Sequence, residues 1–295
     1  MLRTVSENGR TTFSCVPRPA RTVGKDPNER LKLIRERVGS IVQTYCDFLD
    51  GDVFLPNPAK HTDSVDVIEI SSPESIGWSY ATQENAVSFY DRKPTETDSG
   101  HRDAVILLSE KPLRRDVGIF LAPADCAIVG LSHRDPSVDF AALIHSGWKG
   151  TAKDIVGQTV DRVKAIFGNS VTDDLEAFIS PFAKSCCYEF GLDTFSGAFM
   201  EGRVPETNGL NTLTYPLWYK LGTPPNFGLQ GRNGKTFLDS GALIHQTLEK
   251  SGIPDERTKD LSICTVCEGH EKGYSSSRKD PEARFGVFIG LKART

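Results

Sequence analysis

Four short apolar segments follow one another between residues 103 and 146, and this run constrains the fold more than any other feature of the chain. The segments have the length of strands, and their sequences are DAVILL, DVGIFLA, DCAIVGLS and VDFAALIHS. Apolar runs of this length between polar breaks are typical of buried β-strands. Further strands are expected at 64–70, 174–181, 261–267 and 284–291.

Two amphipathic helices are predicted after this run of strands. Thr151 is a good N-cap residue, and Asp154 completes a capping-box pattern in front of apolar residues at helical spacing, which end at Gly168. Asp239 caps a second predicted helix, which ends before Gly252. Because strands alternate with helices and some strands are adjacent, we expect an α/β fold with a mixed β-sheet flanked by helices.

The chain is expected to form a single domain, because it shows no internal repeat and no clean boundary. Residues 1–28 are polar and lack periodicity, which predicts an N-terminal extension or an irregular first strand. The domain itself would span residues 29–295. Residues 26–49 have the pattern of an amphipathic helix, whereas residues 71–102 are polar and predict a long connection or insertion.

Composition and charge exclude several classes of protein. The net charge of -4 argues against a dedicated nucleic-acid binder, which would carry a basic stripe. The sequence has no run of about 18 apolar residues, so no membrane span is expected. The N-terminus has no apolar core of signal-peptide length, and the seven cysteines are odd in number and irregularly spaced. We therefore expect free thiols in a reducing compartment and a cytoplasmic protein.

Cys126 and His145 are the first candidates for chemistry. Each lies at the end of a predicted strand, where sheet proteins place their sites. A thiolate and an imidazole suit zinc, and they equally suit a cysteine nucleophile paired with a histidine base. An open catalytic zinc needs a third ligand. His61, directly before the strand at 64–70, can supply it, and His101 is the competitor.

Two further motifs provide candidate ligand-binding residues. The stretch SGWKG is predicted to be a tight strand-to-helix turn, in which Gly147 and Gly150 let the backbone approach a ligand closely. The helix N-terminus behind it would offer N–H groups to an anion. Arg278 and Lys279 follow a run of serines, where they form either a solvated loop or a phosphate contact.

Four other cysteines are expected to have no role in metal binding. Cys264 and Cys267 form a C-x2-C pair, which we place on a strand, and no second pair has the spacing of a structural zinc site. Cys186 and Cys187 are adjacent and are interpreted as packing residues near a turn.

Several of these stretches resemble one family, the laccase-domain or YfiH-like proteins, first called multicopper polyphenol oxidases and now regarded as zinc-dependent purine nucleoside phosphorylases. The matching motifs run in order along most of the chain: AKHTDSVDVI around His61, RDAVILL, Ala124-Asp125-Cys126, HSGWKGT, SPFAKSCCYEFG, Cys264-Thr265, YSSSRK and Ala283-Arg284. Some positions depart from the family pattern: Ala59 replaces Gln, Thr62 replaces Gly, and Lys149 and Lys279 replace Arg.

The resemblance implies an α/β fold in which His61, Cys126 and His145 bind one zinc ion in a cleft. It also implies that a purine nucleoside such as adenosine or inosine reacts with phosphate, with adenosine deamination as a side activity. Phosphate would be held by Lys149, Arg278 and the backbone at Gly147 and Gly150. Lys149 stands where the family has an arginine. A guanidinium can donate two parallel hydrogen bonds to a phosphate, whereas the lysine ammonium acts as a point charge.

The acid that protonates the leaving base would be Asp125 or Glu189. Three other interpretations stay open. One is a metal-free hydrolase with Cys126 as nucleophile and His145 as base. Another is a copper-dependent polyphenol oxidase, although six histidines are few for a multicopper enzyme. The last is a nucleoside-binding protein without activity. The oligomeric state is not predicted.

Overall fold

The structure is a computed structural model that describes residues 2–17, 50–56, 64–70, 78–84, 87–92, 95, 102–189, 229–232, 235–261, 263–269, 271–274, 278–279 and 284–294. The helix expected over 26–49 and the candidate ligands His61 and His101 lie outside these residues.

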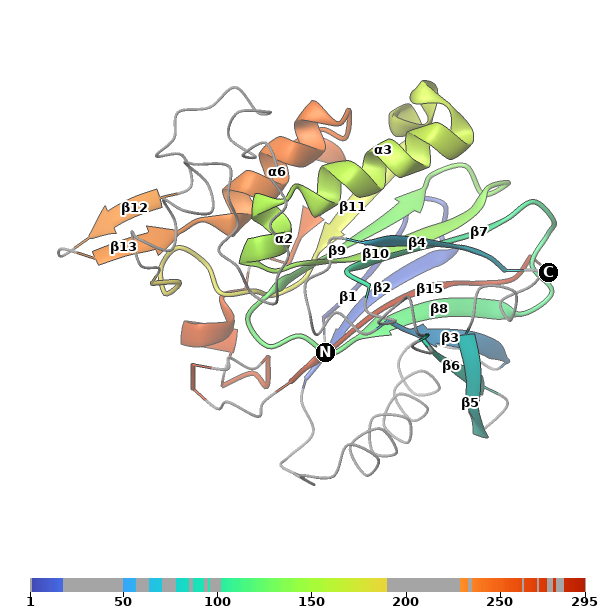
Figure 1. Ribbon diagram of the computed structural model, residues 1–295, viewed down its shortest axis with the longest axis horizontal. Coiled ribbons are helices and arrows are strands. Elements are labelled where there is room, and N and C mark those ends of the chain that lie inside the picture. Colours follow the sequence, from blue (N-terminus) through green and yellow to red (C-terminus); the bar gives the residue numbers. More distant parts are fainter. Residues whose placement is uncertain are drawn as a thin grey trace.

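Two mixed sheets dominate the fold (Figure 1). The seven-stranded sheet has the order β1 (Leu2–Val5), β2 (Thr11–Val16), β15 (Gly286–Leu291), β8 (Asp116–Leu121), β3 (Gly51–Leu55), β6 (Val87–Arg92) and β5 (Trp78–Glu84). The six-stranded sheet has the order β14 (Thr258–Asp260), β11 (Leu175–Ile179), β9 (Ala127–His133), β10 (Asp139–Ser146), β7 (Ala104–Ser109) and β4 (Val65–Glu69). The α/β class with mixed sheets flanked by helices is confirmed, although the strands divide between two large sheets.

The remaining elements are short or lie outside the two large sheets. A separate hairpin consists of β12 (Leu229–Arg232) and β13 (Lys235–Leu238). The helices are α2 (Trp148–Ala152), α3 (Ile155–Phe167) and α6 (Ser240–Lys250), with the 3-10 turns Asn169–Asp174 and Asp255–Arg257 and the π-helical turn Thr265–Gly269. Among the described residues, none of these helices combines the length and apolar character that crossing a bilayer requires.

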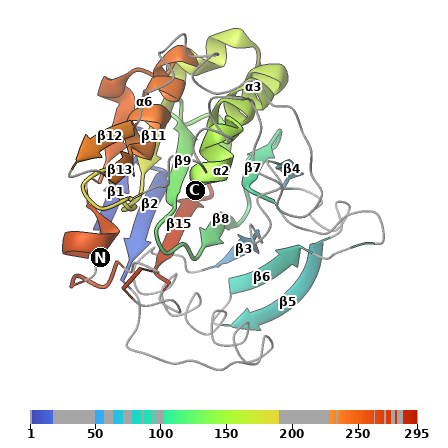
Figure 2. The same cartoon turned by 60° about the vertical axis from the view of Figure 1, so that its left-hand side comes forward.

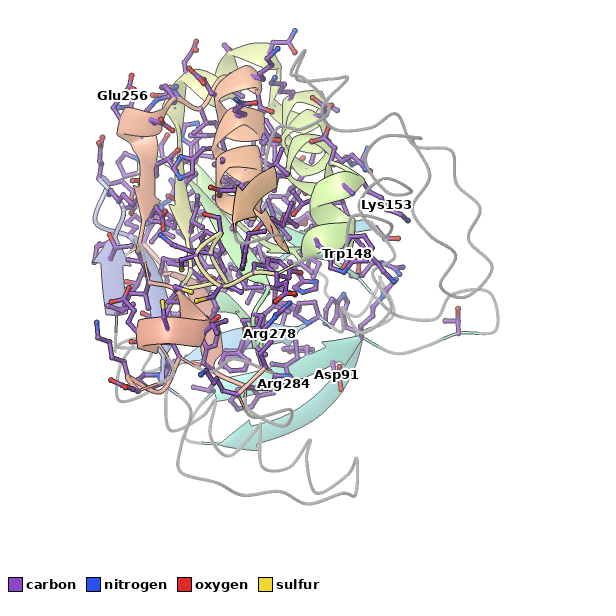
Figure 3. All side chains as sticks on the ribbon, turned by 90° about the vertical axis from the view of Figure 1, so that its left-hand side faces the viewer. Asp91, Trp148, Lys153, Glu256, Arg278 and Arg284 are labelled. Atoms are coloured by element: carbon purple, nitrogen blue, oxygen red, sulfur yellow. The ribbon has the colours of Figure 1, made fainter. Side chains whose placement is uncertain are left out.

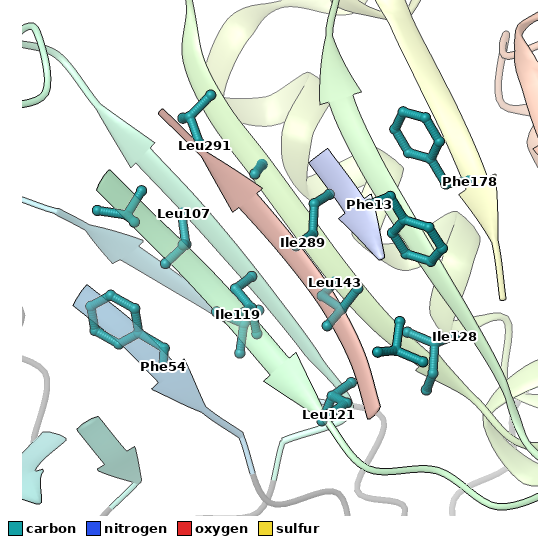
Figure 4. Packing of buried hydrophobic residues seen from close by; sticks show 14 of the residues in the cluster. Phe13, Phe54, Leu107, Ile119, Leu121, Ile128, Leu143, Phe178, Ile289 and Leu291 are labelled. Carbon is teal, nitrogen blue, oxygen red and sulfur yellow. The ribbon is translucent and has the colours of Figure 1, made fainter. Parts of the chain in front are cut away.

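The main hydrophobic core lies between the two large sheets (Figure 4). Its side chains come from alternate positions of facing strands, as in Ile119 and Ile289 of the seven-stranded sheet and Leu143 of the six-stranded sheet. Phe13 and Phe178 stack across this interface with their ring centroids 5.5 Å apart. Because the side chains of a strand alternate between its two faces, the same strands also supply residues to cores on the outer faces.

Helices α3 and α6 cover the outer face of the six-stranded sheet (Figure 1). Val160 and Val163 of α3 and Ile244 of α6 are buried against apolar residues of this sheet. The predicted N-cap of α6 is confirmed, because the Ala242 amide donates a hydrogen bond of 3.0 Å to Asp239 Oδ1. Gly168 follows the last turn of α3, with a φ of +90° that favours glycine.

The predicted N-cap at Thr151 is wrong. The chain enters a short helix earlier, with Gly147 as the N-cap of α2, and Thr151 lies inside that helix. The Thr151 hydroxyl donates to the Gly147 carbonyl at 3.0 Å, so it bonds backward rather than capping the residues that follow. Asp154 adopts a left-handed conformation with φ of 63° and separates α2 from α3.

Two polar segments contain strands that the sequence pattern did not reveal. Residues 2–16, expected to be an extension or an irregular strand, form the regular antiparallel pair β1 and β2. The segment 71–102, expected to be a long connection, contains β5 and β6 at the edge of the seven-stranded sheet, away from α3 and α6 (Figure 2). Trp78 of β5 packs edge-on against Phe54, with ring centroids 5.3 Å apart.

Candidate functional site

The register of β9 and β10 brings Cys126 and His145 together. His145 lies opposite Ile128, and Cys126 precedes β9 by one residue. His145 comes two residues after Leu143, and Cys126 two residues before Ile128, and both of these apolar residues belong to the core between the sheets. The pleat therefore aims His145 toward the seven-stranded sheet, and its ring is hydrogen-bonded to the Cys126 side chain.

Asp103 orients the ring of His145. Its Oδ1 lies 3.1 Å from His145 Nδ1, and both side chains are buried. Burial lowers the pKa of His145, but the charge of the Cys126 thiolate and hydrogen bonds with Asp103 and Cys126 outweigh it and raise the pKa to about 10. The contact engages Nδ1, so a metal ion beside Cys126 would bind the ring at Nε2.

Asp125, the residue before Cys126, accepts hydrogen bonds from two side chains. Its Oδ1 accepts a hydrogen bond of 3.0 Å from the Thr265 hydroxyl, and its Oδ2 accepts one of 3.1 Å from Arg278 Nη1. Asp125 is buried, whereas 37% of the Arg278 side chain is exposed. The carboxylate therefore fixes the guanidinium at the protein surface, where a ligand can reach it.

Tyr188 completes this part of the site. The guanidinium of Arg278 lies over its ring, 4.5 Å from the centroid. Burial raises the pKa of Tyr188, the charges of Cys126 and Asp125 add to the effect, and Arg278 opposes them. The phenol therefore stays protonated and can donate a hydrogen bond beside Cys126.

The predicted phosphate-binding turn forms the start of α2, with Trp148 as the first residue of the helix. Figure 3 draws Trp148 above Arg278 in that projection. Lys149 Nζ lies 5.4 Å from the centroid of the Trp148 ring. Partial burial and the charge of Lys153 lower the pKa of Lys149.

Gly147 and Gly150 have different positions in this turn. Gly147 is the N-cap of α2 and Gly150 lies within that helix. A Cβ at Gly150 would lie 3.2 Å from the His145 carbonyl oxygen and 3.2 Å from Ile155 Cγ2. The close approach at Gly150 is thus an approach of α2 to the backbone at the end of β10.

The other predicted site residues are exposed or lie outside the described part of the chain. Glu189 is exposed, and its backbone forms an isolated bridge with Phe237. Lys279 is exposed beside Arg278. His61, the expected third metal ligand, lies outside the described part of the chain.

Three residues of the site were missed as candidates from the sequence. Asp103, Tyr188 and Thr265 all lie inside motifs that carry the family resemblance, but no local pattern indicates what they contact. Asp103 stands directly before the apolar run of β7. From the sequence alone, a polar residue there indicates only where the strand begins. The pairing of β10 with β7 brings it to His145, whose amide donates to the Asp103 carbonyl at 2.6 Å.

A second group that can hold a metal lies on the segments that carry Tyr188 and Thr265. The four sulfur atoms of this cysteine cluster lie within 4.8 Å of one another: Cys186, Cys187, Cys264 and Cys267. The strand predicted over 261–267 is wrong at its C-terminal end, because Thr265–Gly269 forms a π-helical turn. Spacing along the sequence indicates no second pair for Cys264 and Cys267, whereas the fold brings Cys186 and Cys187 beside them.

Comparison with known proteins identifies relatives along most of the chain. A family model described as multi-copper polyphenol oxidoreductase laccase matches residues 69–292. A purine nucleoside phosphorylase of Clostridium acetobutylicum is 35% identical over 217 residues, covering 73% of this chain and 77% of the relative. An adenosine deaminase, RL5, from an unknown prokaryotic organism is 24% identical over 249 residues, covering 79% of this chain and 80% of the relative.

Solved structures share the fold over nearly the whole chain. YlmD from Geobacillus stearothermophilus superposes with a TM-score of 0.62 at 16% identity, covering 96% of this chain and 91% of that one. YfiH from Bacillus licheniformis gives a TM-score of 0.58 at 20% identity, with 96% and 93% covered. The family model spans most of the sequence, and the fold and the ordered motifs agree with it. The chain therefore belongs to the family of multi-copper polyphenol oxidoreductase laccases.

Proposed function

We propose that this protein is a zinc-dependent purine nucleoside phosphorylase. It would convert adenosine or inosine and phosphate to the free base and ribose 1-phosphate, with adenosine deamination as a side activity. The contact of Cys126 with a histidine held by Asp103, beside the Asp125–Arg278 pair, is the observation that carries the proposal. The phosphorylase and deaminase names of the relatives favour the same chemistry.

Zinc fits the donor set of this site. Cys126 supplies a thiolate and His145 an imidazole, and Asp103 engages the second nitrogen of that imidazole, as carboxylates do behind zinc-bound histidines. His61 is proposed as the third protein ligand on the strength of the family motif. Zinc bound by three protein ligands would supply a Lewis acid with one open position for a substrate oxygen.

Phosphate is proposed to bind between two cations. Arg278 is held by Asp125 and partly exposed, so its guanidinium can donate to phosphate oxygens. Lys149 adds a point charge from a partly buried ammonium. Phosphorolysis joins a phosphate oxygen to C1′ of the ribose and breaks the C1′–N9 bond. The electron pair of that bond leaves with the base, so the base needs a hydrogen-bond donor or an acid.

Asp125, Glu189 and Tyr188 differ in how well each could donate a proton or a hydrogen bond to the leaving base. Asp125 accepts a hydrogen bond at each carboxylate oxygen, so both oxygens are engaged in positioning Thr265 and Arg278. Glu189 is exposed, and its backbone bridges to Phe237, so it suits a buried leaving base less well. Tyr188 is protonated and lies near Cys126, so we place it as the hydrogen-bond donor to the base.

One specific observation favours a second candidate function. Cys126, His145 and Asp103 have the contacts of a nucleophile, a base and an orienting carboxylate, the arrangement of a metal-free cysteine hydrolase. In that case the Cys126 sulfur would bond to an acyl carbon, the bond to the leaving group would break with His145 passing it a proton, and water would then hydrolyse the acyl-enzyme.

Metal removal separates the two functions. The purified protein is assayed for release of hypoxanthine from inosine with and without phosphate, before and after treatment with a strong chelator. The proposal expects activity that requires phosphate, is lost on chelation and returns with zinc. Hydrolysis of an activated acyl ester that survives chelation but is lost in Cys126→Ala, with no release of hypoxanthine, would favour the hydrolase. Binding of inosine without any turnover would favour a nucleoside-binding protein.

A further inference from the structure

The cysteine cluster joins two segments that lie far apart in the sequence. Cys186 and Cys187 belong to one segment, Cys264 and Cys267 to the other, and Phe182 forms a parallel bridge with Cys264. The Phe182 amide donates to the Ile263 carbonyl at 3.2 Å, so backbone contacts hold the segments together beside the sulfur atoms. The convergence of four thiols is thus built into the fold.

The spacing of the sulfur atoms matches a tetrahedral metal site. Zinc–sulfur bonds of about 2.3 Å place the thiolates of a tetrahedron about 3.8 Å apart. The Cys186 and Cys267 sulfur atoms lie 3.8 Å apart, and all four lie within 4.8 Å of one another. A disulfide would need a bond of about 2 Å between only two sulfur atoms, which leaves the convergence of the other two unexplained.

Tight turns direct each pair of cysteines to one point. Adjacent side chains of an extended strand point in opposite directions, but Cys187 and Tyr188 both donate amide hydrogen bonds to the Lys184 carbonyl at 2.8 Å, so the chain turns there. In the other segment the Gly269 amide donates to the Cys264 carbonyl at 2.7 Å and closes the π-helical turn. A Cβ at Gly269 would lie 2.9 Å from that oxygen, so this turn requires glycine.

The cysteine cluster can be reached from the solvent. Cys264 is buried, whereas Cys186 and Cys267 are exposed, so a metal ion can enter from the solvent side.

We propose that this protein carries a structural zinc site made of four cysteine thiolates, separate from the Cys126–His145 site: Cys186, Cys187, Cys264 and Cys267. Four protein ligands fill the tetrahedron and leave no open position, so this zinc holds structure rather than reacting. The zinc joins the segment that contains Tyr188 to the turn that contains Thr265. The Thr265 hydroxyl in turn donates a hydrogen bond to Asp125. The site therefore supports the residues that fix Arg278.

Metal content of matched variants tests this assignment. Cys267 is exposed, so Cys267→Ser removes one thiolate with little effect on packing, and Cys15→Ala removes a buried thiol of β2 that is not one of the four cluster cysteines. After dialysis against a weak chelator, Cys267→Ser is expected to hold one zinc ion fewer per chain than wild type, and Cys15→Ala the same number as wild type. Equal zinc in Cys267→Ser and wild type would overturn the assignment.

Cobalt substitution gives a test that does not depend on the folding of the serine variant. In Cys126→Ala the cluster is the thiolate site that remains, so Co²⁺ is expected to give strong sulfur-to-metal charge transfer and the intense visible bands of tetrahedral coordination. Absence of these bands, or a disulfide within the cluster of the protein purified without reductant, would overturn the assignment. A variant Cys126→Ala that loses one zinc while Cys267→Ser loses none would support the first site and refute the second, so the two sites are tested independently.

Discussion

Asp103 Oδ1 lies 3.1 Å from His145 Nδ1, on the neighbouring strand of the same sheet, and both side chains are buried. This contact fixes the ring of His145 and directs Nε2 away from Asp103. It links the backbone register of β7 and β10 directly to the chemistry of the site.

Replacing Asp103 with Asn is therefore expected to weaken zinc binding. Loss of the carboxylate behind a metal-bound histidine lowers metal affinity by about 10- to 100-fold. A competition titration with a chromophoric chelator measures the change. Asp139→Asn is the matched control, because Asp139 is a buried carboxylate at the other end of β10, bonded to Arg10. Zinc affinity equal to wild type in Asp103→Asn would show that the contact does not support the metal.

Arg278 is expected to act on phosphate rather than on the nucleoside. Arg278→Ala should raise the KM for phosphate by about 10-fold or more, since a charge-assisted contact contributes about 1.5–3 kcal/mol. Arg278→Lys should recover only part of the loss, because a point charge cannot replace the planar guanidinium. The KM values for phosphate and inosine are measured separately. Lys272→Ala serves as control, because Lys272 is exposed and pairs with Glu268. An unchanged phosphate KM in Arg278→Ala would remove Arg278 from the phosphate site.

His245 is expected to make stability depend on pH. Its Nδ1 lies 2.8 Å from Asp255 Oδ1 and its Nε2 3.8 Å from Asp260 Oδ2, which also pairs with Lys184. The contacts with Asp260 and Asp255 raise the pKa of His245 more than burial lowers it. The stabilisation is therefore complete below the unfolded pKa of about 6.5 and is lost as pH rises through the higher folded pKa.

Urea unfolding of His245→Gln and wild type across this range measures the effect. At low pH the variant should be less stable by about 0.2–1 kcal/mol, the range of partly exposed ion pairs, and the difference should vanish at alkaline pH. A difference that grows with rising pH would contradict the sign argued from the ion pairs.

The core between the sheets should depend strongly on Phe178. Its ring is fully buried and stacks on Phe13, so Phe178→Ala is expected to cost about 3–5 kcal/mol of unfolding free energy. Phe167→Ala is the matched control, because Phe167 is 39% exposed at the end of α3 and should cost about 1 kcal/mol or less. Similar losses in the two variants would contradict the placement of the core.

The sequence predicts the buried strands well and the polar ones poorly, for a physical reason. A strand buried on both faces, such as β9 or β10, reads as a continuous apolar run, whereas the edge strand β5 mixes Trp78 with polar residues and resembles a loop. Thr151 was misassigned because a capping residue and a residue bonding backward in a short helix have the same local pattern.

The candidate site was predictable only in part. Cys126 and His145 stand at strand ends, which local reasoning can find. Their contact with Asp103, and the convergence of Cys186 with Cys267 across 81 positions, depend on long-range packing that no local spacing encodes.

Phosphorus NMR of the zinc-loaded protein with inosine and phosphate tests the central claim most directly, because it identifies the product rather than the loss of substrate. We predict a ribose 1-phosphate signal that grows in equal amount with free hypoxanthine, and no such signal with Cys126→Ala. Hypoxanthine with free ribose, or no turnover by the zinc-loaded protein, would contradict the account.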